Sequence, residues 1–199
     1  MKRLVLAAAI GTGLVIAFAG PASAHPLGNF TINQFTGLHV GPDAIVIDLV
    51  TDMAEIPTYQ VRSDIDTDGD GTFDEQEQGA WRDAQCAAQA DHLTIELDGR
   101  AVGPIPGGAA ALSFPPGQGG LPTLRLECPL RAPLVAAGRT HTLTYEDDNF
   151  TGRLVWREII AVGDGSTIHP SDVGDIVVPN RLTQYPKDVL SSPPNQRTA

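Results

Sequence analysis

Residues 29–40 read NFTINQFTGLHV and residues 43–55 read DAIVIDLVTDMAE, and these two segments decide the fold class. β-Branched and other apolar residues recur in both at a spacing close to two, which is typical of half-buried strands. Gly41, Pro42 and Asp43 stand at the junction, and residues of these types form turns. The stretch therefore predicts two neighbouring strands joined by a short turn.

Residues 66–77, DTDGDGTFDEQE, match the calcium-loop pattern D-x-[DN]-x-[DN]-G-x₅-E at every position. Calcium loops of the EF-hand kind need acidic ligands at alternating positions, a glycine at the sharp turn, and a final acid that offers two oxygens. The predicted calcium ligands are Asp66, Asp68, Asp70, Thr72, Asp74 and Glu77. Thr72 would act through its backbone carbonyl and Asp74 through a water. The alternative is an acidic, solvated turn without an ion.

The loop is unpaired, because no second stretch of the sequence matches the pattern. EF-hands of the sensor kind open a helix pair when calcium binds. We therefore expect a structural ion, bound with a dissociation constant of roughly 10⁻⁴–10⁻³ M, as in extracellular modules. A regulatory role is the alternative.

The segments around the loop differ in composition. Residues 74–92 are rich in Ala, Glu and Gln, which favours a helix, and Pro57 begins a shorter helical stretch. Strand patterns follow in residues 93–99, 121–130, 140–147 and 152–162. The order predicts a mainly β protein of the α+β class, an antiparallel β-sandwich with an EF-hand-like helix–loop–helix inserted at about residues 56–90.

Residues 1–24 combine a cationic start, an apolar stretch and a small-residue cleavage motif that ends at Ala24. We expect a signal peptide cleaved after Ala24, an exported domain over residues 25–185, and a polar, linker-like tail over residues 186–199. An uncleaved membrane anchor is the alternative for the leader. The expected location is outside the cytoplasmic membrane, either secreted or held at the membrane through a further C-terminal part.

Export bears on the two cysteines of the chain, Cys86 and Cys128. Outside the cytoplasm an isolated pair usually oxidises, so we expect a Cys86–Cys128 disulfide. Two buried free thiols are the alternative. A metal–thiolate site is less consistent with the sequence, which has no CxxC spacing.

Cleavage after Ala24 would make His25 the first residue of the mature chain. A terminal histidine can chelate a metal ion through its α-amine and its imidazole Nδ1 together, and imidazole suits transition metals. His25 is therefore a candidate ligand for Ni²⁺, Co²⁺ or Cu²⁺. The alternative is that the cleavage site merely happens to precede a histidine.

Charge and motifs disfavour two classes of function. The formal net charge of −11 would repel nucleic acid. The sequence has no G-x-S-x-G, no H-E-x-x-H and no P-loop pattern. We therefore expect that the protein is not an enzyme; a small hydrolase without a local signature is the alternative.

Several stretches are informative together: HPLGNFTINQFTGL (25–38), DMAEIPTYQ (52–60), the calcium loop, DNFTGRLVWREI (148–159) and YPKDVLSSPPNQRTA (185–199). This series resembles the extracytoplasmic amino-terminal region of bacterial membrane proteins of the nickel/cobalt transporter type. The resemblance covers nearly the whole mature chain. It implies an exported β-rich domain followed by a linker and a bundle of membrane helices, with metal ions and a downstream transporter portion as partners.

We therefore expect an exported calcium-binding domain with a single EF-hand, which serves as the extracytoplasmic module of a nickel/cobalt-type divalent metal transport protein. Calcium would be mainly structural. The alternative is a stand-alone secreted calcium-binding or adhesion-type β-sandwich protein without a transition-metal role.

Overall fold

The computed structural model of the chain describes residues 25–134, 140–152, 154–177, 180–186, 190 and 192–199. The predicted signal peptide, residues 1–24, lies outside the described residues. Within the part of the chain that the structure describes, no helix combines the length and the apolar character needed to cross a membrane.

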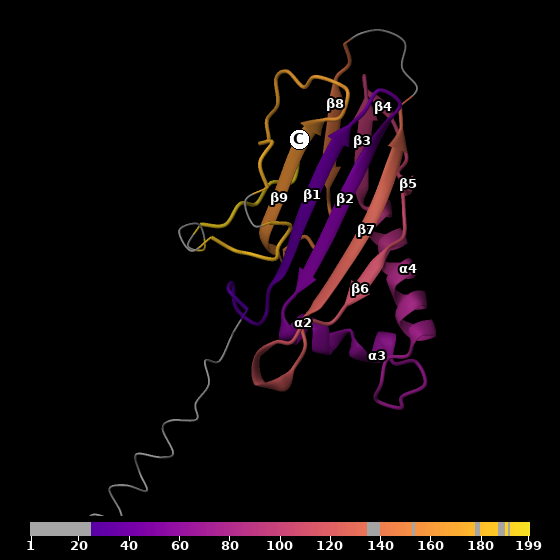
Figure 1. The fold of residues 1–199 in the computed structure, drawn as a ribbon, viewed down its shortest axis with the longest axis vertical. Coiled ribbons are helices and arrows are strands. Elements are labelled where there is room, and N and C mark those ends of the chain that lie inside the picture. Colours follow the sequence, from indigo (N-terminus) through magenta and orange to yellow (C-terminus); the bar gives the residue numbers. More distant parts are fainter. Residues whose placement is uncertain (1–24, 135–139, 153, 178–179, 187–189, 191) are drawn as a thin grey trace, which may run out of the picture.

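The larger of two sheets has six strands, in the order β5–β7–β2–β1–β9 with β6 also paired to β7 (Figure 1). The strands are β1 (Ile32–Val40), β2 (Ala44–Met53), β5 (Ile105–Pro106), β6 (Ala111–Ser113), β7 (Leu124–Pro133) and β9 (Leu154–Gly163). β1 and β2 are the two strands predicted from residues 29–55. They pair antiparallel with Val40 opposite Ile45, and the turn closes where Gly41 N donates to Ala44 O.

In the described part of the chain, a smaller sheet and three helices complete the fold. The smaller sheet has the order β4–β3–β8, with β3 (Leu93–Leu97), β4 (Arg100–Ala101) and β8 (Leu143–Asp147). The helices α2 (Glu55–Gln60), α3 (Arg62–Ile65) and α4 (Glu75–Asp91) follow one another between β2 and β3. α4 corresponds to the helix predicted over residues 74–92. A 3₁₀ turn, η2 (Gln118–Gly120), precedes β7.

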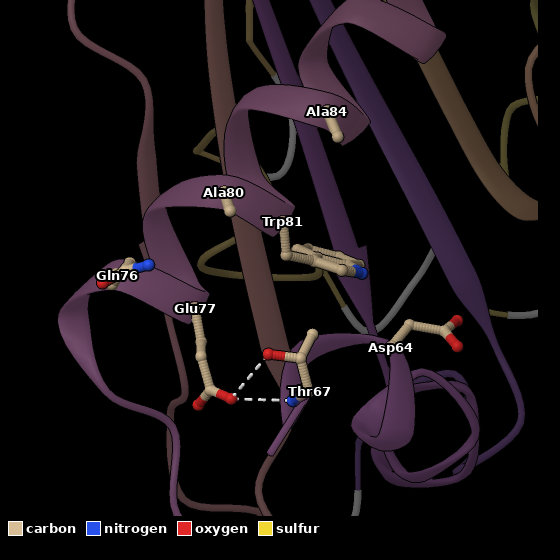
Figure 2. Close-up of a pocket in the computed structure, with 7 residues that line it drawn as sticks. All are labelled: Asp64, Thr67, Gln76, Glu77, Ala80, Trp81 and Ala84. Carbon is tan, nitrogen blue, oxygen red and sulfur yellow. Dashed lines mark hydrogen bonds between the residues drawn. The ribbon is translucent and has the colours of Figure 1, made fainter.

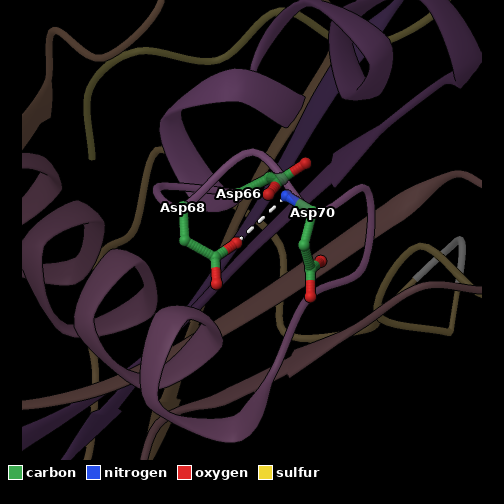
Figure 3. A group of neighbouring side chains, drawn as sticks. All are labelled: Asp66, Asp68 and Asp70. Carbon is green, nitrogen blue, oxygen red and sulfur yellow. Dashed lines mark hydrogen bonds between the residues drawn. The ribbon is translucent and has the colours of Figure 1, made fainter.

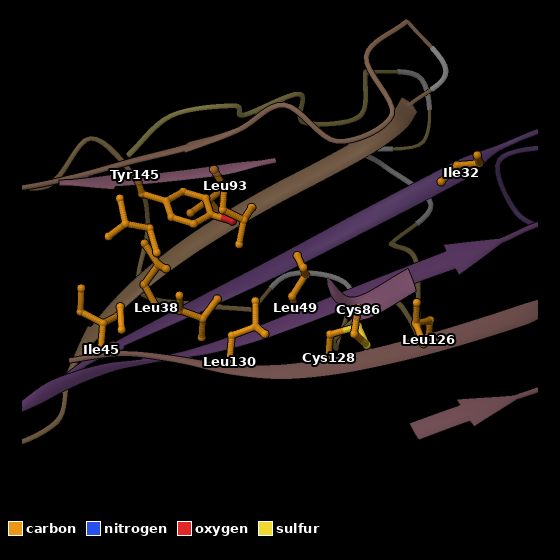
Figure 4. Packing of buried hydrophobic residues seen from close by; sticks show 14 of the residues in the cluster. Ile32, Leu38, Ile45, Leu49, Cys86, Leu93, Leu126, Cys128, Leu130 and Tyr145 are labelled. Carbon is orange, nitrogen blue, oxygen red and sulfur yellow. A yellow bond between two sulfur atoms is a disulfide. The ribbon is translucent and has the colours of Figure 1, made fainter. Parts of the chain in front are cut away.

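One face of the larger sheet packs against both the smaller sheet and α4. Side chains alternate along a strand, so Leu38 of β1 and Leu49 of β2 point to the same interior, where Tyr145 of β8 meets them (Figure 4). Trp81 and Cys86 of α4 belong to the same buried cluster. Burying a leucine side chain of this kind contributes about 1.5–3 kcal/mol. The two sheets therefore share one core, as expected for a sandwich.

Covalent and polar links join α4 to the sheet. The predicted Cys86–Cys128 disulfide is confirmed, with a Cα–Cα distance of 5.5 Å between α4 and β7. Thr51 of β2 donates from Oγ1 to Gln89 Oε1 of α4 at 2.8 Å inside the core. In the chain-entropy model, a disulfide that closes a loop over 42 residues contributes about 4 kcal/mol. The helix that follows the predicted calcium loop is therefore fixed to the larger sheet.

The mainly β, α+β class is confirmed, and the larger sheet differs from the expectation in one strand pair. All the named strand pairs are antiparallel except β1 and β9, which run parallel. Consecutive strands joined by a short turn must be antiparallel. β9 instead follows β8, which lies in the other sheet, so no hairpin sets its direction. The larger sheet is therefore mixed.

The last residues of the chain lie between the two sheets. Arg157 N of β9 donates to Pro194 O, and Tyr145 N of β8 donates to Ala199 O, both at 2.8 Å. Residues 194–199 thus pair with the edge of each sheet. A strand edge exposes unpaired backbone groups, and this segment satisfies some of them. The linker-like character expected for residues 186–199 does not extend to this segment.

Candidate metal centre

The predicted calcium loop lies between α3 and α4 and brings its first three acids together (Figure 3). Asp66, Asp68 and Asp70 each place a carboxylate oxygen so that these oxygens lie within 4.8 Å of one another. Asp66 is half-buried, whereas Asp68 and Asp70 are exposed. Three carboxylates held this close repel one another, and their oxygens are the ligands that Ca²⁺ prefers.

Backbone groups of the loop orient these carboxylates. Gly71 has φ = +87°, a left-handed conformation that glycine adopts without strain, and its N–H donates to Asp66 Oδ2 at 3.0 Å. Asp70 N donates to Asp68 Oδ1 at 3.1 Å. Thr72 donates to Asp70 Oδ1 from both its backbone N and its hydroxyl, each at 2.7 Å. The loop is therefore wound around its acids.

One carboxylate oxygen of the loop lacks a hydrogen-bond partner in the part of the chain that the structure describes. Asp66 Oδ1 is buried and has no hydrogen-bond partner among the described residues. A buried polar atom without a partner costs stability, and a cation in the loop would supply that partner. The two hydrogen bonds from Thr72 hold the pKa of Asp70 below its usual value, so Asp70 is ionised at neutral pH. The residues present therefore fit a calcium ion.

Asp74 and Glu77 are held at the start of α4 rather than with the three aspartates. Asp74 Oδ1 accepts from Glu77 N at 2.8 Å, and Glu77 Oε2 accepts from Asp74 N at 3.2 Å, which is a reciprocal capping box. Glu77 Oε1 accepts from Thr67 N at 2.7 Å (Figure 2). Glu77 thus reaches back into the loop, but its oxygens accept hydrogen bonds from backbone N–H groups and from the hydroxyl of Thr67.

Opposing effects act on the pKa of Glu77. Desolvation raises it, but the hydrogen bonds from Thr67, Asp74 and Asp68 together hold the pKa below its usual value. Glu77 is therefore an anion at neutral pH. It would have to exchange these hydrogen bonds to bind an ion through both oxygens.

Aromatic contacts fix the loop to the rest of the domain. Phe73 packs against Phe114 with a centroid distance of 5.1 Å. The guanidinium of Arg62 lies 5.4 Å from the centroid of the Phe73 ring, and Arg62 Nη2 donates to Gly71 O. These contacts hold the two ends of the loop in place. A hollow lined by Asp64, Thr67 and residues of α4, among them Trp81, lies next to it (Figure 2).

His25 lies apart from the calcium loop, on the other face of the larger sheet. Its Nε2 is 2.7 Å from Asp52 Oδ2, and the side chains of His25 and Asp52 are only 6% and 10% exposed. Tyr185 OH donates to the same Asp52 oxygen at 3.0 Å. The Tyr185 ring also makes edge contacts with the rings of His25 and Trp156. We call these four residues the His25 cluster.

Sequence reasoning singled out His25 but missed Asp52, Tyr185 and Trp156. A signal for them was present, because each lies in one of the stretches that carry the family resemblance. Nothing in the local pattern indicates that stretches so far apart in the chain meet. Their meeting depends on the register of β1, β2 and β9.

Comparison of the chain with family models, with curated proteins and with solved structures found no match. The resemblance to the nickel/cobalt transporter type therefore stays a prediction.

Proposed function

We propose that this chain is an exported calcium-binding domain whose single EF-hand loop holds one Ca²⁺ between α3 and α4. We further propose that it is the extracytoplasmic module of a nickel/cobalt-type divalent metal transport protein. The observation that carries the calcium proposal is the arrangement at Asp66. One oxygen accepts from Gly71 N, and the other is buried beside two further carboxylates, without a hydrogen-bond partner in the described part of the chain.

The chemistry of the loop favours calcium. Its donors are all oxygens, and the three aspartates crowd negative charge into one turn. Ca²⁺ accepts six to eight oxygen ligands in flexible geometry, whereas Mg²⁺ demands a near-ideal octahedron and keeps several waters. Glu77 lies at the end of the loop and is anionic. On calcium binding it would exchange its contacts with Thr67 and Asp74 for the ion.

A structural role follows from how α4 is held. The disulfide to β7 and the Thr51–Gln89 hydrogen bond fix α4 to the larger sheet. An ion in the loop would therefore stiffen the link between α3 and α4 rather than swing α4 outward. We expect calcium to stabilise the domain without a large change of shape.

Two observations support export. A disulfide is typical of proteins that fold in an oxidising compartment, and residues 1–24 have the pattern of a signal peptide. The transport role rests on the sequence resemblance alone. The coding sequence downstream of Ala199 separates it from the stand-alone secreted alternative. Several apolar spans there support the transport module, whereas a stop codon with no neighbouring transporter supports the alternative.

Titration calorimetry on the oxidised domain tests the calcium proposal. We expect one Ca²⁺ to bind with a dissociation constant in the range of roughly 10⁻⁴–10⁻³ M, and Mg²⁺ to bind much more weakly. Glu77→Gln removes one of the two oxygens that the last ligand offers and should weaken calcium binding at least about tenfold. Asp91→Asn is the matched control, because it removes an exposed carboxylate of α4 outside the loop.

Unchanged calcium affinity in Glu77→Gln would refute the loop assignment. So would a wild-type domain that binds no Ca²⁺ at millimolar concentration. If Asp91→Asn weakened binding as much as Glu77→Gln does, the effect would be one of overall charge rather than of a ligand.

A further inference from the structure

The residues from His25 to Gly28 form a turn that sets the place of the His25 ring. Gly28 N donates to His25 O at 2.9 Å, and Gly28 has φ = +98°, where a side chain would be strained. Pro26 suits the second position of such a turn because its own φ is restricted. The ring of His25 is thereby turned inward, against the larger sheet, instead of into solvent.

Asp52 determines which ring nitrogen carries the proton. An ionised carboxylate can only accept hydrogen bonds, and Asp52 Oδ2 already accepts from Tyr185 OH at 3.0 Å. The 2.7 Å contact of the same oxygen with His25 Nε2 therefore places a proton on Nε2. In the neutral imidazole the lone pair then lies on Nδ1, the nitrogen nearer to the backbone of His25.

The contacts of Nδ1 are weak by comparison. Leu27 N lies 3.4 Å from Nδ1, and Thr31 Oγ1 lies 3.3 Å from it. The Thr31 hydroxyl also donates to Gly28 O at 2.9 Å, which occupies its only proton. Both distances to Nδ1 exceed the usual hydrogen-bond range. Nδ1 would therefore give up little when it binds another partner.

A strained segment brings Tyr185 to this place. Asn180, Arg181 and Leu182 all have positive φ, of 46°, 55° and 65°, which is uncommon for residues other than glycine. Arg181 offsets the strain by donating to both carboxylate oxygens of Asp48, at 2.6 and 2.7 Å, and Leu182 is buried. Strain of this kind persists only where the surroundings hold it, and it is frequent at ligand sites.

From these contacts we infer that the mature amino terminus is a second metal site. The α-amine and Nδ1 of His25 chelate one divalent transition-metal ion, while Asp52 and Tyr185 position the ring. This inference rests on the proposed export, because cleavage after Ala24 is what frees the α-amine. Asp52 is a positioning residue, which acts through His25 Nε2 as carboxylates behind metal-bound histidines commonly do.

The two sites of the domain then select different ions. The calcium loop offers only oxygens, whereas the amino terminus offers two nitrogens, which suit Cu²⁺ and Ni²⁺. The affinity of nitrogen sites for divalent first-row metals follows the Irving–Williams order, in which Cu²⁺ stands above Ni²⁺. Cu²⁺ should therefore bind more tightly than Ni²⁺. The two sites also lie on opposite faces of the larger sheet, since the α4 face and the His25 face belong to separate buried clusters.

The test uses the domain with His25 as its first residue, released from a cleavable tag, in buffer with excess Ca²⁺. Titration with Cu²⁺ and with Ni²⁺ should give one site for each metal, with the Cu²⁺ site tighter. The electron paramagnetic resonance spectrum of the Cu²⁺ form should show nitrogen ligands. Asp52→Asn keeps an oxygen acceptor for Nε2 but removes its charge, and should weaken Cu²⁺ binding about 10–100-fold.

The matched control is a chain with four residues, Gly-Ser-Ser-Gly, placed before His25. It displaces the α-amine and leaves the ring and Asp52 unchanged, so it should lose Cu²⁺ binding at this site at least about 100-fold, because one of the two chelating groups is gone. Wild-type affinity in the extended chain would overturn the chelate, and wild-type affinity in Asp52→Asn would overturn the role of Asp52.

Two further measurements separate this inference from the proposed function. Glu77→Gln should retain Cu²⁺ binding, since it alters only the calcium loop. Sequencing the amino terminus of protein recovered from outside the cytoplasm shows whether His25 is its first residue. If the first residue is another one, the α-amine of His25 is not free in the exported protein. The inference would then be wrong for that protein, whatever the purified domain binds.

Discussion

Calcium should stabilise this domain through Asp66. The substitution Asp66→Asn distinguishes the contribution of the bound ion to stability from that of the hydrogen bonds within the loop. Asn retains an oxygen that can accept from Gly71 N, a hydrogen bond of 3.0 Å in the wild type. It places an amide NH₂ group where Asp66 Oδ1 is buried with no hydrogen-bond partner among the residues that the structure describes. The ion loses one charged ligand, while the fold of the loop keeps its main backbone contact.

The size of the effect follows from mass action. A ligand at a concentration about 100-fold above its dissociation constant adds about 2.7 kcal/mol to the free energy of unfolding. For a domain of this size, each kcal/mol raises the melting temperature by about 2–4 °C. Saturating Ca²⁺ should therefore raise the melting temperature of the wild type by roughly 5–11 °C. In Asp66→Asn the same addition should raise it by less than about 2 °C.

The difference in melting temperature between Asp66→Asn and the wild type should disappear or change sign when calcium is removed. In EGTA the wild type keeps three neighbouring carboxylates that repel one another, and Asp66→Asn has one charge fewer. The variant should therefore melt at the same temperature as the wild type or slightly higher in EGTA, and at a lower temperature in Ca²⁺. Scanning calorimetry in both buffers measures the two differences. A calcium shift that is equal in wild type and variant would contradict the reasoning, as would a large loss of stability in EGTA.

Three further predictions concern the fold around the site. Cys86→Ala combined with Cys128→Ala should lower the free energy of unfolding by about 4 kcal/mol, and wild type reduced with dithiothreitol should show a similar loss in urea denaturation. Leu49→Ala should cost about 2–5 kcal/mol in the same assay because Leu49 is fully buried, whereas Val46→Ala, at a position 44% exposed, should cost far less. Desolvation raises the pKa of Asp147 above its ordinary value despite opposing hydrogen bonds. The protonated Asp147 side chain therefore contributes to stability at low pH, and this contribution is lost as the pH rises through the raised pKa. Stability measured against pH should therefore fall less in Asp147→Asn over that range, and identical profiles would contradict the assignment.

Apart from the disulfide, the features that the sequence predicts correctly depend on residues close together in the chain. The alternation in residues 29–55 predicts β1, β2 and their turn, because strand periodicity is a local property. The composition of residues 74–92 predicts α4 for the same reason. The loop pattern predicts that Asp66, Asp68 and Asp70 lie together, since acidic residues two positions apart need no distant partner to meet. The disulfide is predictable because the chain has only two cysteines.

By itself, then, the sequence determined the fold class, the strand pair at its start, the helix α4 and the cluster of Asp66, Asp68 and Asp70. Only the tertiary structure decided the parallel pairing of β1 with β9, the insertion of residues 194–199 between the sheets, and the contact of His25 with Asp52 and Tyr185. The physical reason is that these contacts join residues 27 or more positions apart. Their free energy depends on register and burial across the whole core, which no local pattern encodes.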